Sequence, residues 1–473
     1  MTTNTTTGTS ITLTNKKREL IFFNIMLTGI IGSMMMTALI TALPVIMTDL
    51  QINASTGQWL TSIYALVTAI VIPLSPSLIT SVPSKRLYCS SLTLFCAGLI
   101  VCAVSSDFSM LIAGRVIQAI GAAILGPMGQ VILFSIYPPD RTGSIMGWYG
   151  MAMGVAPIIA PMLTGLIIDF VGWQMVFWIV LMLMLATLLL AFAVFDNILP
   201  IAQKPFDAIS FTLSAISFGG ITLAIGNLGN YSFLTPQTGA VLLVGLGATM
   251  IFIWRQLRLK EPFLDVQLFT KYKTFTYASV ATILLNLMLM GFSVLSPLYV
   301  QSVKSYSATF FGIFSLPGAL LMATISPATG NYYDRHGIRT LLFVGSIAML
   351  LCNLGMSIIP YEMNISIAIV LDMLCLFGMG CVTMPLITWG LSAVPTEKTA
   401  DATALLNTLR SVAGAIGTTM FAGITTVAMT RSTQNTETLA MLDGLHAAYG
   451  CICVVNLLLL LIAVFGAKKQ TNL

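Results

Sequence analysis

Apolar stretches of about twenty residues run through this chain almost from end to end, and they constrain its fold more than any other feature. Because backbone groups in lipid must be hydrogen-bonded internally, only helices or closed barrels can span a membrane. Transmembrane strands are about ten residues long and alternate in polarity, whereas these stretches are longer and continuously apolar. The pattern therefore predicts an all-α integral membrane protein.

Fourteen stretches qualify as spans. They cover residues 20–46, 57–80, 87–105, 108–136, 145–168, 174–196, 207–228, 237–256, 275–301, 308–329, 339–359, 364–391, 402–428 and 444–466. Span 4 carries Arg115, Gln118 and Gly121, and span 12 carries Asp372, Cys375 and Gly378 at the same spacing. Spans that are equivalent in two internal repeats would show this correspondence.

A long basic connection near the middle of the chain, 256–274, follows spans 7 and 8. It favours a 6+2+6 arrangement, in which two extra helices are inserted between two six-helix bundles. The predicted parts are a disordered cytoplasmic N-terminus at 1–19, an N-terminal bundle at 20–196, the inserted pair and linker at 197–274, a C-terminal bundle at 275–466 and a cytoplasmic tail at 467–473.

Charge supports the same topology. Only 8% of the 473 residues are charged and 57% are hydrophobic, against about 25% charged residues in soluble domains. With the N-terminus inside the cell, 17 of the 21 basic residues fall in cytoplasmic segments. Only Lys304 and Arg431 fall in extracellular segments. We therefore expect a multi-pass protein of the cell membrane with both termini in the cytoplasm. The net charge of +5 follows from this topology and requires no nucleic-acid partner.

Residues for cofactor or metal chemistry are sparse. The two histidines, His336 and His446, lie in or near loops, and the sequence contains no HExxH motif, Cys/His cluster or GxxxxGK[ST] phosphate loop. The eight cysteines fall in or beside apolar stretches, which is typical of free thiols that pack as small hydrophobic residues. The sequence does not favour an enzyme, and it predicts neither a cofactor nor a metal.

A short charged segment separates spans 10 and 11, with the spacing GxxxDRxGxR. It is formed by Gly330, Asp334, Arg335, Gly337 and Arg339, and it resembles the cytoplasmic loop signature of major facilitator superfamily transporters. We expect Gly330 to end a span and the charges to form an intracellular gate, by pairing or by meeting a helix end. The corresponding positions of the first repeat are eroded, with Ser81 and Val82 in place of the aspartate and arginine.

Two further motifs lie in spans 4 and 5. RVIQAIGAA at 115–123 resembles the RxxQGxG motif of proton-coupled facilitators. Span 5 resembles the antiporter signature G(x8)G(x3)GP(xx)GG, with small residues replacing three of its glycines. The matching residues are Gly147, Ala156, Pro157, Ala160, Pro161, Thr164 and Gly165. Small residues at this spacing also serve ordinary helix packing.

With ALP at 42–44, EPFLD at 261–265 and NTLRSVAGAIGT at 407–418, the chain resembles the fourteen-span drug:proton antiporter family that includes EmrB and QacA. The resemblance implies the major facilitator fold, a monomer in the lipid bilayer, and efflux of small amphipathic or hydrophobic compounds driven by protons through alternating access. The alternatives are an exporter or uptake porter of one metabolite or lipid, and a non-transporting membrane sensor.

Asp372 is the carboxylate placed deepest in a predicted span, about eight residues into span 12. In a low dielectric it could take up and release protons and so couple them to transport, with Arg115 modulating that step. The alternatives are that Asp372 only bridges helices and that Arg115 only ties helices together or extends toward the surface. Span 1 has no acidic residue at 32–37, which favours neutral or monocationic substrates over dications.

A cavity for hydrophobic drugs needs polarizable and adaptable walls. The candidate residues come from seven spans and are Met35, Tyr64, Gln118, Met151, Asn286, Met290, Phe377, Asn407 and Arg410. Any single methionine among them is also suited to packing against a neighbouring helix or lipid.

Overall fold

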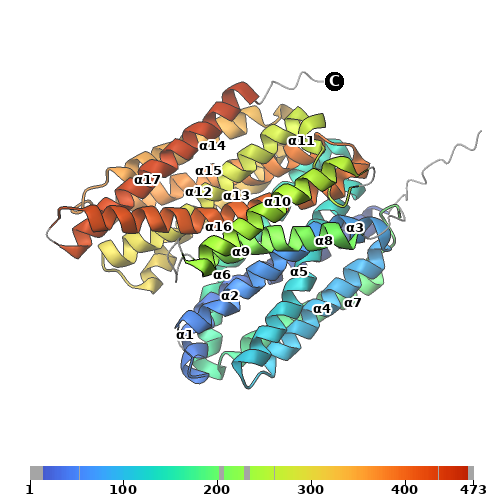
Figure 1. Cartoon of the computed structure of the whole chain (residues 1–473), viewed down its shortest axis with the longest axis horizontal. Coiled ribbons are helices and arrows are strands. Elements are labelled where there is room, and N and C mark those ends of the chain that lie inside the picture. Colours follow the sequence, from blue (N-terminus) through green and yellow to red (C-terminus); the bar gives the residue numbers. More distant parts are fainter. Residues whose placement is uncertain are drawn as a thin grey trace, which may run out of the picture.

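The computed structural model of the chain describes residues 14–52, 54–201, 207–227, 235–259, 262–434 and 436–466. Every regular element in these ranges is a helix, and Figure 1 shows long helices gathered into two groups, with the green helices α8 to α10 between them in this view. The all-α prediction is confirmed.

The first group contains six spans. Its elements are α1 (Asn15–Asp49), α2 (Ala54–Val71) continued by η1 (Ile72–Leu74) and α3 (Ser75–Ser81), α4 (Ser84–Ala103), α5 (Phe108–Ile136), η2 (Pro139–Arg141), α6 (Thr142–Val171) and α7 (Gln174–Val194). The inserted pair follows, with α8 (Ala208–Ser214), η3 (Ala215–Gly219) and α9 (Gly220–Asn227) in the first span, and η4 (Pro236–Ala240) and α10 (Val241–Arg258) in the second.

A short helix, α11 (Leu268–Lys271), leads into the second group of six spans. Its elements are α12 (Lys273–Leu298) continued by η5 (Tyr299–Val303), α13 (Ala308–His336), α14 (Arg339–Ser357), α15 (Ile365–Ser392), η6 (Thr396–Lys398), α16 (Thr399–Arg431), α17 (Glu437–Leu461) and η7 (Ile462–Gly466). We call the two groups the N-bundle and the C-bundle.

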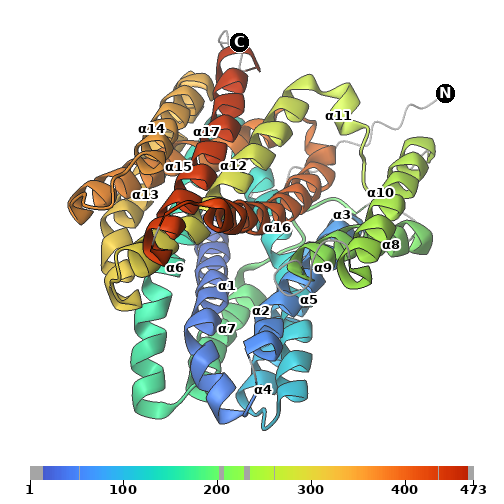
Figure 2. The same ribbon diagram turned by 60° about the vertical axis from the view of Figure 1, so that its left-hand side comes forward.

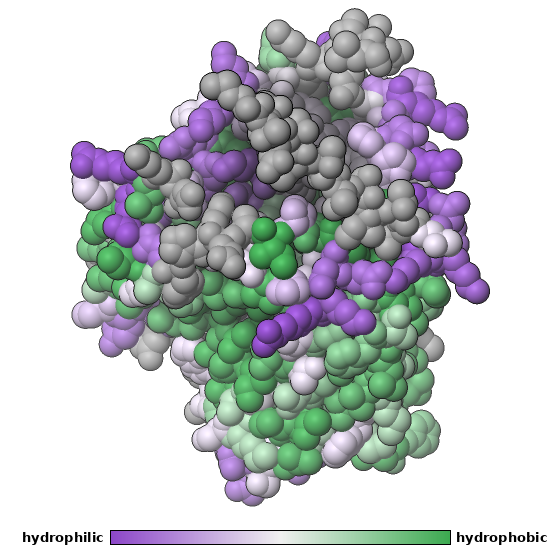
Figure 3. Space-filling model, turned by 90° about the vertical axis from the view of Figure 1, so that its right-hand side faces the viewer, coloured by the Kyte–Doolittle hydropathy of each residue, from purple (hydrophilic) through white to green (hydrophobic). Residues whose placement is uncertain are grey.

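Thirteen helical stretches in the described ranges are long and apolar enough to cross a membrane. The fourteenth predicted span is α6, a helix of 30 residues, part of whose side chains lies outside the described residues. Large apolar side chains such as Phe170, Leu189 and Phe465 are at least 70% exposed, and Figure 3 shows a broad hydrophobic surface with hydrophilic residues gathered mainly at one end. A surface of this kind requires lipid around it.

Two predicted boundaries are wrong by seven residues. Span 14 is predicted to begin at residue 444, whereas α17 begins at Glu437, and span 10 ends later than predicted. The sequence ends span 10 at residue 329 and assigns Gly330 as its terminating residue. The structure continues α13 through Gly330 to His336, and Gly337, with φ at +75°, is the residue that ends it. Asp334 and Arg335 therefore project from a rigid helix end and not from a loop.

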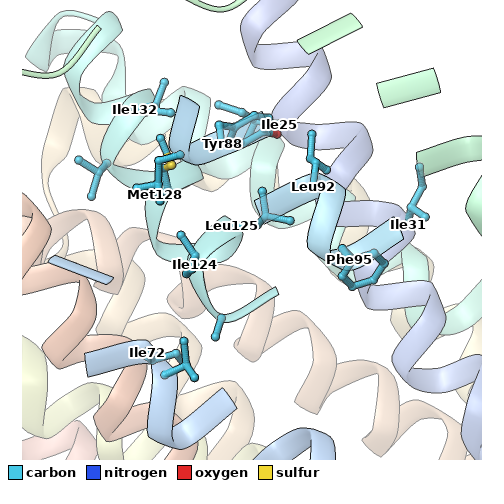
Figure 4. Close-up of a cluster of buried hydrophobic side chains, with 14 of the residues drawn as sticks. Ile25, Ile31, Ile72, Tyr88, Leu92, Phe95, Ile124, Leu125, Met128 and Ile132 are labelled. Carbon is cyan, nitrogen blue, oxygen red and sulfur yellow. The ribbon is translucent and has the colours of Figure 1, made fainter. Parts of the chain in front are cut away.

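Each bundle has its own hydrophobic core. In the N-bundle, side chains spaced along single helices meet across α1, α4 and α5, as Figure 4 shows. The labelled residues of these helices are Ile25, Ile31, Tyr88, Leu92, Phe95, Ile124, Leu125, Met128 and Ile132. This core continues into Met384, Ile387 and Leu391 of α15 and Leu405 and Leu406 of α16. Within the described ranges, the bundles thus share apolar packing at the end of α15 and α16 that the sequence places in the cytoplasm.

The two bundles approach most closely where α6 crosses α13. A Cβ at Gly147 would lie 2.5 Å from the carbonyl oxygen of Ser326, and a Cβ at Gly330 would collide with the backbone of Gly143. Only glycine permits backbones to come this close. Away from this end the ribbons of the two bundles diverge, as the separation of α4 and α7 from α13 and α14 in Figure 2 shows.

Candidate functional site

Asp334 joins the two bundles at the predicted cytoplasmic end. Its carboxylate accepts hydrogen bonds from the backbone N–H groups of Gly143 and Ser144, each at 2.7 Å. These groups belong to the first turn of α6, where unpaired N–H groups and the helix dipole favour a negative charge. Of the two alternatives for Asp334, the structure shows the contact with a helix end. Arg335 and Arg339 are exposed.

Side chains of α16 make further contacts with the N-bundle near this end. The amide nitrogen of Asn407 donates to the side-chain oxygen of Gln130 in α5 at 3.1 Å. Arg410 interacts electrostatically with Tyr149 in α6. Sequence reasoning singled out Asn407 and Arg410 but missed Gln130 and Tyr149. A polar glutamine deep in an apolar span was the available signal for Gln130.

Arg115 lies buried in the N-bundle, with only 1% of its surface exposed. Its Nε donates to the carbonyl oxygen of Leu60 at 3.2 Å, and its Nη1 donates to the side-chain oxygen of Gln118. The guanidinium carbon lies 4.3 Å from the centroid of the Tyr64 ring, a distance at which a cation is attracted to an aromatic face. Neutral groups therefore stabilise this buried charge.

Asp372 lies buried in the C-bundle, with 3% of its surface exposed. Its Oδ1 accepts a hydrogen bond from the Ser296 hydroxyl in α12 at 3.2 Å, while its Oδ2 has no hydrogen-bond partner. That oxygen faces α13, because a Cβ built on Gly318 would lie 3.0 Å from it. Among the described residues, no hydrogen bond or ion pair joins Asp372 to Arg115.

A cavity of about 200 Å³ lies inside the N-bundle. Its walls carry small residues on α1 and α5, and aromatic residues and methionines on α2, α4, α6 and α7. The lining residues are Ile25, Thr28, Gly29, Gly32, Ser33, Tyr64, Tyr88, Phe95, Ala122, Leu125, Gly126, Tyr149, Met153 and Met184. Tyr64 belongs to the predicted cavity set, and Gln118 lies one helical turn from Ala122 on the same face of α5. The tyrosines at 88 and 149 were not predicted.

The other predicted cavity residues lie elsewhere. Met35 is buried in the core of the N-bundle, and Met151 is half-buried. In the C-bundle, Asn286 donates to the Thr282 carbonyl of its own helix, Met290 contacts Gly414, and Phe377 packs against the core.

Residues of the span 5 signature take different positions along α6. Gly147 is at the crossing with α13. Ala156, Ala160 and Thr164 are buried, whereas a Cβ at Gly165 would meet open space. The side chains at 157 and 161 lie outside the described residues.

One salt bridge joins the two inserted spans, and another joins the linker to the C-bundle. Arg255 of α10 forms a salt bridge with Asp207 at 3.0 Å. Burial raises the pKa of Asp207, but hydrogen bonds from Ser210 and the charge of Arg255 outweigh it and lower the pKa below its ordinary value. Asp265 of the EPFLD segment pairs with Lys398 of η6 at 2.7 Å, which fixes the linker to the start of α16.

Two bundles of six membrane spans, packed together at one end and carrying buried charges of opposite sign, define a membrane transporter of the two-bundle class. Among the described residues no group of three or more His, Cys, Asp or Glu could hold a metal ion. The model of the Major Facilitator Superfamily matches residues 25–418. The chain belongs to the major facilitator superfamily, whose members are transporters and not enzymes.

Known proteins resemble the chain over most of its length. An uncharacterised facilitator-type transporter of Bacillus subtilis, YcnB, is 33% identical over 92% of this chain and 91% of its own length. The lincomycin resistance protein LmrB of Listeria innocua is 32% identical over 84% of each chain. The crystal structure of the human organic anion transporter MFSD10 superimposes with a TM-score of 0.68 over 94% of this chain and 99% of that chain, and at 15% identity it bears on the fold alone.

Proposed function

We propose that the protein is a proton-coupled efflux antiporter of the cell membrane that exports amphipathic or hydrophobic compounds by alternating access. The similarity to a lincomycin resistance protein supports export of a toxic compound. The oxygen atom of Asp372 that lacks a hydrogen-bond partner is the single observation that carries the proton-coupling part of the proposal.

A buried carboxylate is costly unless it is paired or protonated. In the described part of the chain, Ser296 alone donates to Asp372, so a proton on Oδ2 would remove most of the cost. A conformation that opened this region to water would favour release of the proton. Alternation between the two environments would couple proton movement to the conformational change.

The packed end of the molecule corresponds to an outward-facing state if the sequence-based topology holds. Opening toward the cytoplasm would then separate Asp334 from the first turn of α6 and Asn407 from Gln130. These contacts form the intracellular gate of the proposal. Arg335 and Arg339, which are exposed in this state, would act by meeting anionic lipid or the opposite bundle when the gate opens.

Everted membrane vesicles that contain the full chain test the function. After energisation, a panel of amphipathic compounds is added, and both the internal pH and the accumulation of each compound are followed. We expect substrate-induced proton release and accumulation that a protonophore abolishes. Accumulation of several unrelated compounds would support a multidrug exporter, and accumulation of a single compound would support a specific porter. If neither proton release nor accumulation were observed, transport by antiport would be refuted.

Topology is tested separately, by labelling single cysteines with a membrane-impermeant reagent in intact cells. The two sites are Ser305, beyond η5, and His336, at the end of α13, in a background where the exposed Cys451 is replaced. We expect labelling at position 305 and none at position 336. The reverse pattern would invert the topology and place the packed end outside the cell.

A further inference from the structure

The cavity of the N-bundle has a chemical character that the proposed function does not specify. A volume of about 200 Å³ is slightly larger than the roughly 150 Å³ apolar cavity that accommodates benzene. Tyr64, Tyr88, Phe95 and Tyr149 line it. A Cβ on Gly126 would meet no atom within 4 Å, so its wall on α5 is open. The size and the aromatic walls suit an aromatic system of one or two fused rings.

One guanidinium contacts a tyrosine of the cavity wall, and a second lies within electrostatic range of another. Arg115 stacks on the ring of Tyr64, and Arg410 interacts electrostatically with Tyr149. The salt bridges among the described residues involve Lys17, Arg255 and Lys398 and neither of these two arginines. No carboxylate lines the cavity. In a low dielectric, two such cations produce a positive potential that attracts anions and repels cations.

An unused hydrogen-bond donor lies next to the same wall. Gln118 is 0% exposed, and its side-chain nitrogen has no hydrogen-bond partner while its oxygen accepts from Arg115. Gln118, Ala122 and Leu125 follow one another at helical spacing on one face of α5, and the last two line the cavity. A buried donor without a partner is rare and calls for an acceptor.

We infer that the N-bundle cavity is a substrate subsite for an aromatic ring that carries an anionic, hydrogen-bond-accepting group. The inference rests on the proposed transport function and names its substrate class. The missing acid of span 1 alone favours neutral or monocationic substrates over dications, whereas the two arginines shift the preference of this subsite from monocations to aromatic acids. The ring packs among Tyr64, Tyr149 and Phe95, and its acidic group turns toward Arg115 and Gln118.

The test measures equilibrium binding to the purified full chain in lipid nanodiscs with three probes that share one ring system. They are 2-naphthoate, 2-naphthylmethanol and 2-naphthylmethylammonium, which are anionic, neutral and cationic. We expect the anion to bind at least ten times more tightly than the cation, with the alcohol between them. Equal affinities, or tightest binding of the cation, would overturn the inference.

Two variants locate the site. Gly126→Leu fills the open space and should weaken binding of the naphthoate and the alcohol at least tenfold. Its matched control is Gly247→Leu in α10, where a Cβ likewise meets no atom within 4 Å and which lies outside the cavity. Arg410→Gln should lower naphthoate affinity about fivefold and change that of the alcohol less than twofold. Unchanged naphthoate binding by Gly126→Leu would show that the site lies elsewhere.

Binding in nanodiscs requires no proton gradient, so the two proposals fail separately. Anion-selective binding by a protein that shows no gradient-driven efflux would support the subsite and refute the antiporter. Gradient-driven efflux of other compounds, together with no binding of any naphthalene probe, would support the antiporter and refute the subsite.

Discussion

The N-bundle and the C-bundle share one architecture and differ in the sign of their buried charge. At positions of spans 4 and 12 that match in sequence spacing, the N-bundle carries Arg115 and the C-bundle carries Asp372. The arginine is surrounded by a carbonyl oxygen, an amide and an aromatic ring. The aspartate has one hydroxyl donor and an oxygen without a partner.

This difference indicates that the two bundles have different electrostatic roles, one fixing a potential and the other changing its charge. A guanidinium that keeps its charge is suited to fixing a potential, and a carboxyl in the opposite bundle is suited to changing its charge during a cycle. The end of the molecule differs in the same way, because Asp334 of the second repeat contacts α6 whereas Ser81 stands at its place in the first. The C-bundle thus carries both acidic groups of the proposed mechanism.

Removal of the C-bundle acid tests the comparison most severely. Asp372→Asn should lower gradient-driven efflux about a hundredfold, because an amide cannot take up and release the proton. Substrate binding to the purified protein should persist. Glu362→Gln, which removes an exposed carboxylate of the same bundle, should transport normally. An Asp372→Asn variant that still concentrates substrate would leave Asp372 a structural role only.

The charge of the N-bundle is tested by two substitutions of one residue. Arg115→Gln should lower efflux about tenfold, because it removes the charge and leaves the oxygens of Leu60 and Gln118 without their donor. Arg115→Lys keeps the charge and should lose about threefold. Equal losses of efflux in the two Arg115 variants would mean that packing, and not the charge, determines the effect. A loss as large as that of Asp372→Asn would contradict different roles for the two buried charges. Efflux rates are normalised to the folded protein present.

Weakening the contact of Asp334 with α6 should lower efflux less than the Arg115→Gln substitution does. Asp334→Asn keeps one acceptor and loses the negative charge at the first turn of α6, an interaction of about 1 kcal/mol. We expect efflux to fall about fivefold while the melting temperature in detergent stays within about 2 °C of that of the wild type. Glu397→Gln in η6, an exposed residue, is the control. Wild-type turnover by Asp334→Asn would exclude the gate.

Adding to the first repeat the aspartate that the second repeat carries should have the smallest effect on transport. Ser81 ends α3, which packs against α16, and its buried hydroxyl has no hydrogen-bond partner. Ser81→Asp should place a carboxylate toward the first turn of α16 and add a second contact of the Asp334 type, slowing transport about twofold. Val82→Asp at the neighbouring position serves as a control for the added charge. Faster transport by Ser81→Asp would contradict an equivalent geometry in the two halves.

Sequence alone predicted the helical class, the family and the ends of most spans, because length and apolar character decide what can cross a bilayer. It did not predict that α13 continues past Gly330, since glycine favours a helix end as readily as a close crossing of two backbones. The contact of Gln130 with Asn407 joins residues 277 positions apart, and no local pattern reveals such a pair. The role of the tyrosines at 88 and 149 also depends on tertiary packing.

The continuity of α13 has a mechanical consequence. One helix carries Gly318, which faces Asp372, and Asp334, which holds α6, and these positions lie sixteen residues and about 24 Å apart along its axis. Pro327 interrupts the backbone hydrogen bonding between them. A tilt of α13 beside Asp372 must therefore either move the contact with α6 as a rigid body or be absorbed by bending at Pro327. The stiffness of the helical turn at Pro327 thus determines whether protonation of Asp372 changes the contact between the bundles.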